Sequence, residues 1–299
     1  MKVKYLAVIA LSLLFMMQGC KRELPYPIDE VKRGVVIDVV RISGTDGVLS
    51  AGQTTGDYRL KLAIPKEQGD YSFMKNAQLL AILRNADGNY STTVAVDNIT
   101  GFPKEIPIDI ADVYSKLGLT APELGQMLYF TTNVVLNDGS TIPGWTEFMG
   151  FNNRAFAGWL VDGRAYSSNV VYAATCPLEL DNFVGTFTVS VDEWWGETPY
   201  PVEVTKISDT ELNISGICDG VCSNDLVITI DPTDHSISFG KQILEPNSGE
   251  WFENPAYFNF ALSAGIGRVD ACDISISFSA TATVDAGSFG AVSFAMKKN

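Results

Sequence analysis

Apolar and polar residues alternate one by one along most of this 299-residue chain, in short runs separated by turn residues. Such alternation is typical of β-strands that have one face in a core and the other in water. Only residues 108–119 carry apolar positions at helical spacing, and Asp109 and Gly118 are suited to cap the two ends of that segment. The pattern therefore predicts an all-β protein with one short helix.

The first block of strands, residues 34–172, predicts an immunoglobulin-like sandwich. A block of about 140 residues is large for that fold, so long loops are expected, with residues 144–163 as the best candidate. That loop contains Trp145 and Trp159. The main strands expected in this block are Val35–Ile42, Tyr58–Ile64, Gln78–Leu83, Ser91–Val96 and Leu128–Leu136.

The second block, residues 173–299, predicts a small antiparallel β-barrel or sandwich, because short strands follow one another without helical periodicity. Its opening at residues 182–187 resembles the start of calycin-like barrels, so a calycin-like barrel is one expected form. The expected strands are Phe183–Val191, Pro201–Ile207, Glu211–Ile217, Asp225–Asp231, Ser236–Phe239, Tyr257–Ser263, Ile274–Ala282 and Ser288–Met296.

The N-terminus predicts export and a lipid anchor. A positively charged start precedes an apolar run over residues 6–17, which is too short for a membrane-spanning helix and leads to Cys20. This arrangement resembles the bacterial lipobox, in which the cysteine thiol takes the lipid after cleavage. We expect a lipoprotein signal peptide at 1–19, lipidation of Cys20, and a polar tether over 20–33.

Composition narrows the classes of function. The chain has 35 acidic and 21 basic residues, a net charge of −14, which becomes −16 when the signal peptide and its two lysines are removed. An acidic chain does not favour nucleic acid as a partner. A single histidine makes His-based metal sites and Ser-His-Asp or Cys-His catalysis hard to build. We therefore expect no enzymatic activity, cofactor, metal or nucleic-acid partner.

Four cysteines remain beside the lipidated one, all in the second block: Cys176, Cys218, Cys222 and Cys272. An even count in an exported domain favours disulfides, and three pairings are possible. Cys218 and Cys222 share one tight loop, CDGVC. If they pair, the other two close a loop of about 96 residues and stabilise the fold by roughly 4–5 kcal/mol in the chain-entropy model. A free, buried pair of cysteines is the main alternative. A four-cysteine zinc site usually needs two pairs of closely spaced cysteines, and the sequence has only one such pair.

Two segments of similar composition carry the candidate binding site. DEWWGETPY covers residues 192–200 and GEWFENPAY covers 249–257, and each places neighbouring aromatics between acids in a loop bounded by Gly or Pro. A sugar ring offers C–H faces that stack on aromatics and hydroxyls that donate to carboxylates. The expected stacking residues are Trp194, Trp195, Trp251, Phe252 and Tyr257, and the expected acceptors are Glu193 and Glu250. Packing of all these rings in the core is the alternative.

Two other features support catalysis only weakly. Glu193 and Glu197, like Glu250 and Glu253, are acids that flank aromatics, and glycoside hydrolysis would need two of them to face one sugar. His235, in the segment DPTDHS, is expected in a turn before a strand, as a solvated surface residue.

The layout resembles a known class of bacterial lipoproteins. The runs DVYSKLGL and LYFTTNVVLNDGS within residues 109–141, and the opening CPLELDNFVGTF at 176–187, are similar to SusE-like accessory proteins of Bacteroidota. Members of that class are encoded beside SusC/SusD-type glycan-uptake systems, bind polysaccharide and are not enzymes. The resemblance implies an outer-membrane lipoprotein on the cell-surface or periplasmic side.

The expected function is therefore non-catalytic binding of polysaccharide or oligosaccharide, as an accessory to a nutrient-uptake system with a SusC/SusD-type complex as a partner. A structural or protein-interaction module of an outer-membrane complex is the first alternative. A carrier of small lipids in a calycin-like barrel is the second, and it requires a continuous apolar cavity, whereas glycan binding requires exposed aromatic rings.

Overall fold

The computed structural model describes residues 34–152 and 160–299, and Val35–Asn299 form one compact unit. The predicted signal peptide, the lipidation site Cys20, the tether and Trp159 lie outside the described residues. Within the described part of the chain, no helix is long and apolar enough to cross a membrane.

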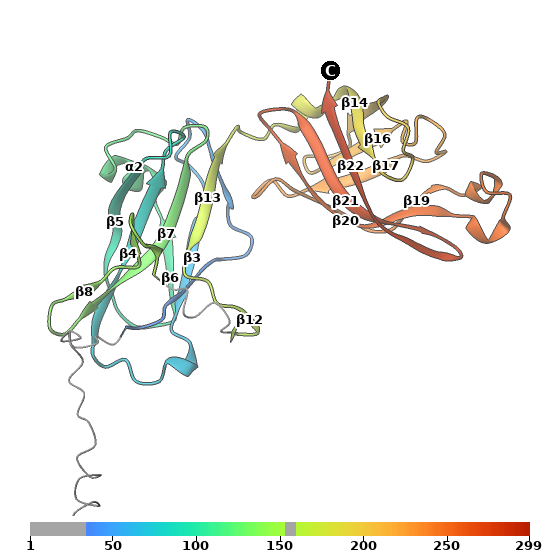
Figure 1. The fold of residues 1–299 in the computed structure, drawn as a ribbon. Coiled ribbons are helices and arrows are strands. Elements are labelled where there is room, and N and C mark those ends of the chain that lie inside the picture. The colour runs from blue at the N-terminus through green and yellow to red at the C-terminus, as the bar shows by residue number, and fades with distance from the viewer. Residues whose placement is uncertain (1–33, 153–159) are drawn as a thin grey trace, which may run out of the picture. The chain divides into compact units, whose positions relative to one another are not determined.

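The first part of the compact unit is a sandwich of two β-sheets (Figure 1). Its main strands are β1 (Asp38–Arg41), β2 (Val48–Ser50), β3 (Tyr58–Ala63), β4 (Met74–Arg84), β5 (Tyr90–Ile99), β6 (Lys104–Ile108), β7 (Met127–Leu136), β8 (Thr141–Ile142) and β13 (Val170–Thr175). One sheet has the order β1-β3-β6, and the other has the order β2-β13-β7-β4-β5 with β8 paired to β7. The β2–β13 pair is parallel, and the other pairs are antiparallel.

Every second side chain along a strand such as β3 points into the space between the two sheets and helps to fill it. Burial in β3 changes at every residue, so that Tyr58, Leu60 and Leu62 face inward. They belong to the same core cluster as Leu79 of β4 and Phe130 of β7, which lie in the opposite sheet. Smaller elements follow at the edges: η1 (Lys66–Gln68), β9 (Trp145–Thr146), β10 (Gly150–Phe151), β11 (Leu160–Val161) and β12 (Arg164–Ala165).

The predicted helix is confirmed as α2, Ile110–Lys116. The Asp109 side chain caps it by accepting a hydrogen bond from the Asp112 N–H at 3.1 Å. Gly118 follows the helix with φ +78°, and its N–H donates to the Ser115 carbonyl oxygen. The helix turns its apolar side, which includes Tyr114, into the sandwich core.

The second part is a closed antiparallel barrel of eight strands, which confirms the all-β, barrel-type fold class. The strands are β14 (Gly185–Asp192), β15 (Tyr200–Lys206), β16 (Glu211–Ser215), β17 (Leu226–Ile230), β18 (Ser236–Phe239), β20 (Phe260–Asp270), β21 (Ser275–Val284) and β22 (Gly287–Lys298). Each pairs with its neighbour in this order, and β14 pairs with β22 to close the barrel (Figure 1). A ninth strand, β19 (Gln242–Glu245), lies along the first half of β20, and η3 (Leu180–Phe183) precedes β14.

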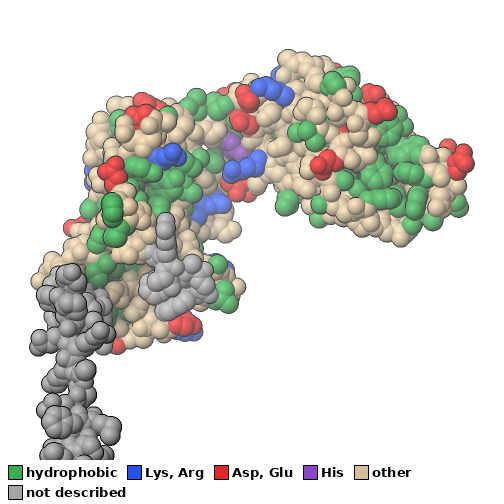
Figure 2. All heavy atoms as spheres, in the orientation of Figure 1, with side chains coloured by type: hydrophobic (Ala, Val, Ile, Leu, Met, Phe, Trp, Pro, Cys, Tyr) green, Lys and Arg blue, Asp and Glu red, His purple; other side chains and the backbone are tan. Residues whose placement is uncertain are grey.

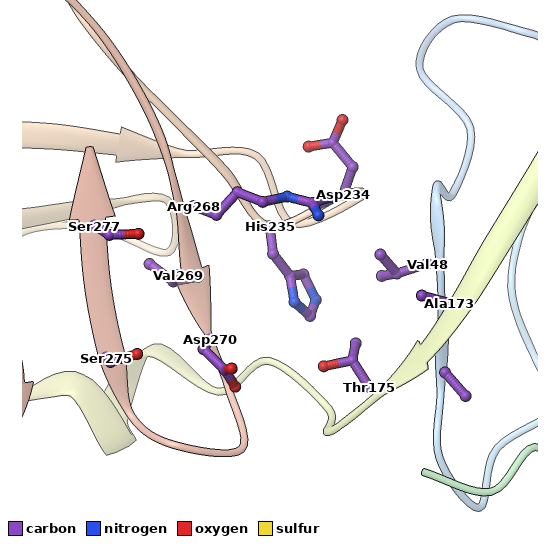
Figure 3. A pocket seen from close by; sticks show the side chains of 11 residues that line it. Val48, Ala173, Thr175, Asp234, His235, Arg268, Val269, Asp270, Ser275 and Ser277 are labelled. Carbon is purple, nitrogen blue, oxygen red and sulfur yellow. The ribbon is translucent and has the colours of Figure 1, made fainter. Parts of the chain in front are cut away.

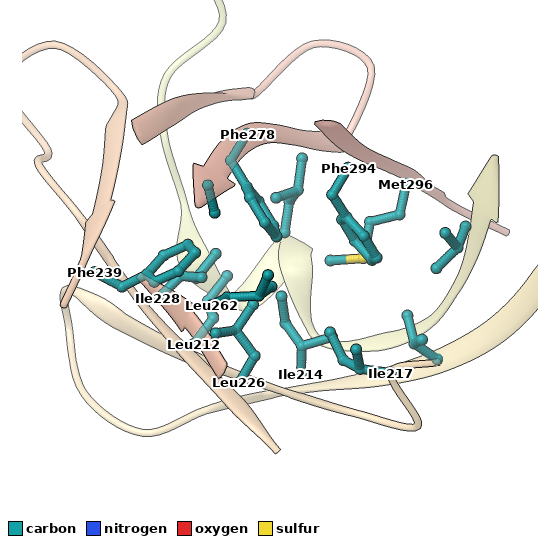
Figure 4. Close-up of a cluster of buried hydrophobic side chains, with 14 of the residues drawn as sticks. Leu212, Ile214, Ile217, Leu226, Ile228, Phe239, Leu262, Phe278, Phe294 and Met296 are labelled. Atoms are coloured by element: carbon teal, nitrogen blue, oxygen red, sulfur yellow. The ribbon is translucent and has the colours of Figure 1, made fainter. Parts of the chain in front are cut away.

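Side chains fill the barrel interior (Figure 4). Phe278 and Phe294 stack with their ring centroids 4.9 Å apart, and residues such as Leu212 and Leu226 face them from the opposite wall. A pocket that reaches this core, lined in part by Leu262, measures only about 10 Å³, which is too small for a lipid.

The sandwich and the barrel meet at a short connection. β13, the last sandwich strand, ends at Thr175, so the predicted boundary between residues 172 and 173 falls inside it. A disulfide between Cys176 and Cys272 then joins this connection to the turn after β20. The second disulfide joins Cys218 to Cys222 within the loop after β16, so that all four cysteines of the barrel part are paired.

The turn before β18 contains His235, as predicted, but the prediction of a solvated surface residue is wrong, because His235 is only 6% exposed. The turn is not free in solvent. The Val269 N–H of β20 donates to the His235 carbonyl oxygen at 3.0 Å, and the Gly47 N–H donates to the Thr233 carbonyl oxygen at 2.7 Å. The polar composition of the segment DPTDHS does not reveal these long-range contacts.

Buried His235 is expected to make stability depend on pH. Burial and nearby Arg268 lower the pKa of His235 below 6.5, against the opposing charges of Asp234 and Asp270. The unfolded chain then binds more protons as pH falls below 6.5, so the free energy of unfolding decreases in this range. Chemical denaturation above the pH range where carboxylates protonate measures this decrease. The variant His235→Asn, which tolerates the positive φ at this position, should lack it, and an equal pH slope in both proteins would contradict the assignment.

Candidate functional site

The two aromatic segments predicted from the sequence meet at one end of the barrel. The first loop, residues 193–199, joins β14 to β15. The second loop, residues 246–259, joins β19 to β20 and contains η4 (Ser248–Glu250) and η5 (Pro255–Tyr257). Trp195 of the first loop contacts Trp251 of the second edge to face, with ring centroids 5.9 Å apart.

Asp192 organises the first loop from the end of β14. The residue is 7% exposed, and its carboxylate accepts hydrogen bonds from the N–H groups of Trp194 (3.2 Å) and Trp195 (3.1 Å) and from the Tyr200 hydroxyl. Burial and the Asp192 carboxylate raise the pKa of Tyr200, so its hydroxyl stays protonated and donates. The Gly196 N–H donates a hydrogen bond to the Asp192 carbonyl oxygen at 2.8 Å, which closes the turn. Gly196 has a φ of +80°, a conformation that glycine adopts without steric cost.

Ser248 and Gly249 organise the second loop. The buried Ser248 hydroxyl donates to the Tyr257 carbonyl oxygen at 2.6 Å and accepts from the Phe260 N–H at 2.9 Å. A side chain at Gly249 would meet the Asn254 carbonyl oxygen at 2.8 Å, so the loop needs glycine there. These contacts fix the backbone that presents the second set of rings.

The turn between β21 and β22 closes the same end. The Ala286 N–H donates to the Ala256 carbonyl oxygen of the second loop at 2.8 Å. This contact places Phe289 of β22 beside Tyr257, with ring centroids 5.8 Å apart, and beside Trp194 at 4.9 Å. The sequence reasoning missed Phe289, which no acids flank and which belongs to neither aromatic segment.

Six rings form the surface that we call the aromatic end: Trp194, Trp195, Trp251, Phe252, Tyr257 and Phe289. Phe252 and Phe289 are 44% and 47% exposed, whereas the other four are partly buried. Figure 2 shows hydrophobic side chains gathered at this end of the barrel, beside acidic ones. The rings are therefore neither all core nor all surface.

The rings divide into a supporting layer and an outer layer. Trp194 stacks on buried Phe260 with centroids 4.2 Å apart and planes 11° apart, so the barrel core covers it. The Trp195 indole N–H is buried without an acceptor among the described residues, so this ring contributes packing. Phe252 contacts Tyr257 edge to face at 5.3 Å and lies farther out than the tryptophans, as its exposure shows.

The predicted acceptors behave differently from one another. Glu193 is exposed, and its carboxylate accepts a hydrogen bond from the Ser293 N–H at 2.7 Å, which holds the first loop to β22. Glu250 and Glu253 of the second loop are exposed, as is Glu197 of the first. The two loops thus provide exposed carboxylates beside the aromatic end. Glycoside hydrolysis uses a carboxylic acid shielded from water, and none of these four residues is shielded in that way.

Comparisons with known proteins add no assignment: no family model, no curated protein and no solved structure matches this chain. Within residues 34–152 and 160–299, no group of three or more metal-ligating side chains is present.

Proposed function

We propose that this chain is a non-catalytic, lipid-anchored protein that binds glycan at the aromatic end of its barrel. One observation carries the proposal: two loops of similar composition, distant in sequence, converge on one surface that combines partly exposed rings with exposed carboxylates. Apolar ring faces and hydroxyl acceptors side by side are what a sugar ring requires.

The division of the rings refines the residue assignment. Phe252, Tyr257 and Trp251 would contact sugar, with Trp194 and Trp195 supporting them from the core side. Glu250 and Glu253 would accept sugar hydroxyls, whereas Glu193 is engaged by the backbone of β22. The hydrogen bonds of Asp192 and Ser248 fix both loops before any ligand binds, which reduces the entropy lost on binding.

The lipid anchor places this surface at a membrane. Each buried CH₂ of an acyl chain contributes about 0.8 kcal/mol, so several chains on Cys20 would hold the protein firmly. The resemblance to SusE-like lipoproteins supports the outer membrane and a SusC/SusD-type uptake complex as the setting. A non-catalytic accessory that retains polysaccharide near a transporter fits an open surface better than an enclosed cleft.

Isothermal titration of the full-length protein against a panel of polysaccharides tests this function. We expect saturable heat with at least one polysaccharide, because the ring surface is already formed. The absence of heat with every glycan would contradict the proposal. If the protein then co-purified with membrane proteins, the exposed rings of Phe252 and Phe289 would instead form a protein interface.

A further inference from the structure

A second concave site lies away from the aromatic end (Figure 3). It is a pocket of about 430 Å³, within the range of small-molecule sites. One wall comes from Val48 of β2 and from Ala173 and Thr175 of β13. The opposite wall comes from the turn before β18, the end of β20 and the start of β21. The Cys176–Cys272 disulfide joins the chain segments beside these two walls.

His235 is the unusual residue in this pocket. It is only 6% exposed, and it lines the pocket. Figure 3 shows the ring projecting from the turn toward Thr175 and the open part of the pocket. In a neutral imidazole one ring nitrogen donates a hydrogen bond and the other accepts one, so this ring can bind a polar partner. The pocket is where such a partner would sit.

The backbone holds His235 in a conformation that most side chains avoid. Its φ is +61°, in the left-handed region. The N–H of His235 donates to the Asp231 carbonyl oxygen at 2.8 Å, and its carbonyl oxygen accepts from Val269. The imidazole therefore points into the pocket because the turn and β20 fix it from both sides.

The pocket presents charges of both signs, from Arg268 and from Asp234 and Asp270, and this favours one class of ligand. Asp234 pairs with Arg41 at 3.4 Å, and exposed Arg268 and Asp270 carry opposite charges. Asp270 would repel an anion, and Arg268 would repel a cation. A neutral ligand rich in hydroxyl groups can donate to the carboxylate and accept from the guanidinium, because it carries both functions in each hydroxyl.

Further lining groups fit the same ligand. Ser275, Ser277 and Thr175 add hydroxyls, while Val48 and Ala173 provide a small apolar floor for C–H groups. We propose that this pocket binds one neutral, hydroxyl-rich ring, such as a single hexose unit, held by His235, Arg268 and the serine hydroxyls. The site is separate from the aromatic end, and occupancy here does not require glycan binding there.

The single histidine makes this proposal directly measurable. Full-length protein labelled with carbon-13 in the histidine ring gives nuclear magnetic resonance signals from one imidazole only. Glucose, galactose, mannose, N-acetylglucosamine and myo-inositol are added separately at pH 7, where the lowered pKa of His235 keeps its ring neutral. We expect a saturable shift of the His235 signals with at least one of these rings.

Two variants test whether the shift of the His235 signals comes from binding in this pocket. Arg268→Ala should weaken the response, whereas Phe252→Ala, at the aromatic end, should leave it unchanged. No saturable shift with any ring would overturn the proposal, as would loss of the shift in Phe252→Ala. A saturable shift with inorganic phosphate or acetate, and none with the neutral rings, would overturn the ligand class. Failure of polysaccharide binding in the calorimeter would not change these outcomes.

Discussion

Replacing Cys176 and Cys272 together by alanine is expected to lower the free energy of unfolding of the barrel by about 4–5 kcal/mol. The two residues are 96 positions apart, and their disulfide restricts the unfolded chain from β14 through β20, which includes six of the eight barrel strands. In the chain-entropy model the stabilisation grows with the logarithm of the number of residues in the closed loop. This disulfide should therefore stabilise the fold more than the disulfide between Cys218 and Cys222.

The short disulfide is the matched control for this effect. Cys218 and Cys222 are only 4 positions apart, and alanine at both is expected to cost about 2 kcal/mol by the same relation. Urea denaturation followed by circular dichroism measures both losses under oxidising conditions. A short-loop variant that loses as much stability as the long-loop variant would contradict the entropic account.

Asp192→Ala is expected to lower the free energy of unfolding by about 3 kcal/mol or more, because the Tyr200 hydroxyl and two tryptophan N–H groups lose their shared acceptor. The first loop should also release its rings, which changes tryptophan fluorescence and weakens the proposed glycan binding. Asp231→Ala is the matched control: Asp231 is exposed, among the described residues its carboxylate accepts only from the nearby Thr233 N–H and hydroxyl, and its loss should cost under about 1 kcal/mol.

If Asp192→Ala and Asp231→Ala had equal effects on stability and fluorescence, the organising role of Asp192 would be wrong. Denaturation midpoints and emission spectra of the two variants, recorded at the same protein concentration, make this comparison.

Alternation in the sequence predicted most barrel strands, because each strand has one face in the core. β18 occupies the predicted residues Ser236–Phe239. β19 was not predicted: Ile243 and Leu244 are adjacent apolar residues, and the strand pairs with only half of β20. The predicted strand over residues 257–263 starts too early, since Pro255–Tyr257 form a short helix that the Asn254 side chain caps.

The candidate site was predictable in composition but not in geometry. The similarity of the segments 192–200 and 249–257 identified five of the six rings, because that signal is local. Their meeting depends on the closure of the barrel by β14 and β22 and on the fold of the second loop, which are long-range. Phe289 and the burial of His235 depend on the same long-range pairing, so neither has a local signal.

The most direct test of the proposed glycan binding at the aromatic end is calorimetry of the double variant Phe252→Ala/Tyr257→Ala with a polysaccharide that gives saturable heat with the wild type. Phe148→Ala is the matched control, since that ring is 97% exposed on the sandwich, far along the chain from both loops. We expect affinity to fall at least about tenfold in the double variant, equivalent to about 1.4 kcal/mol, and to stay unchanged in the control. Unchanged affinity in a folded double variant would contradict the account.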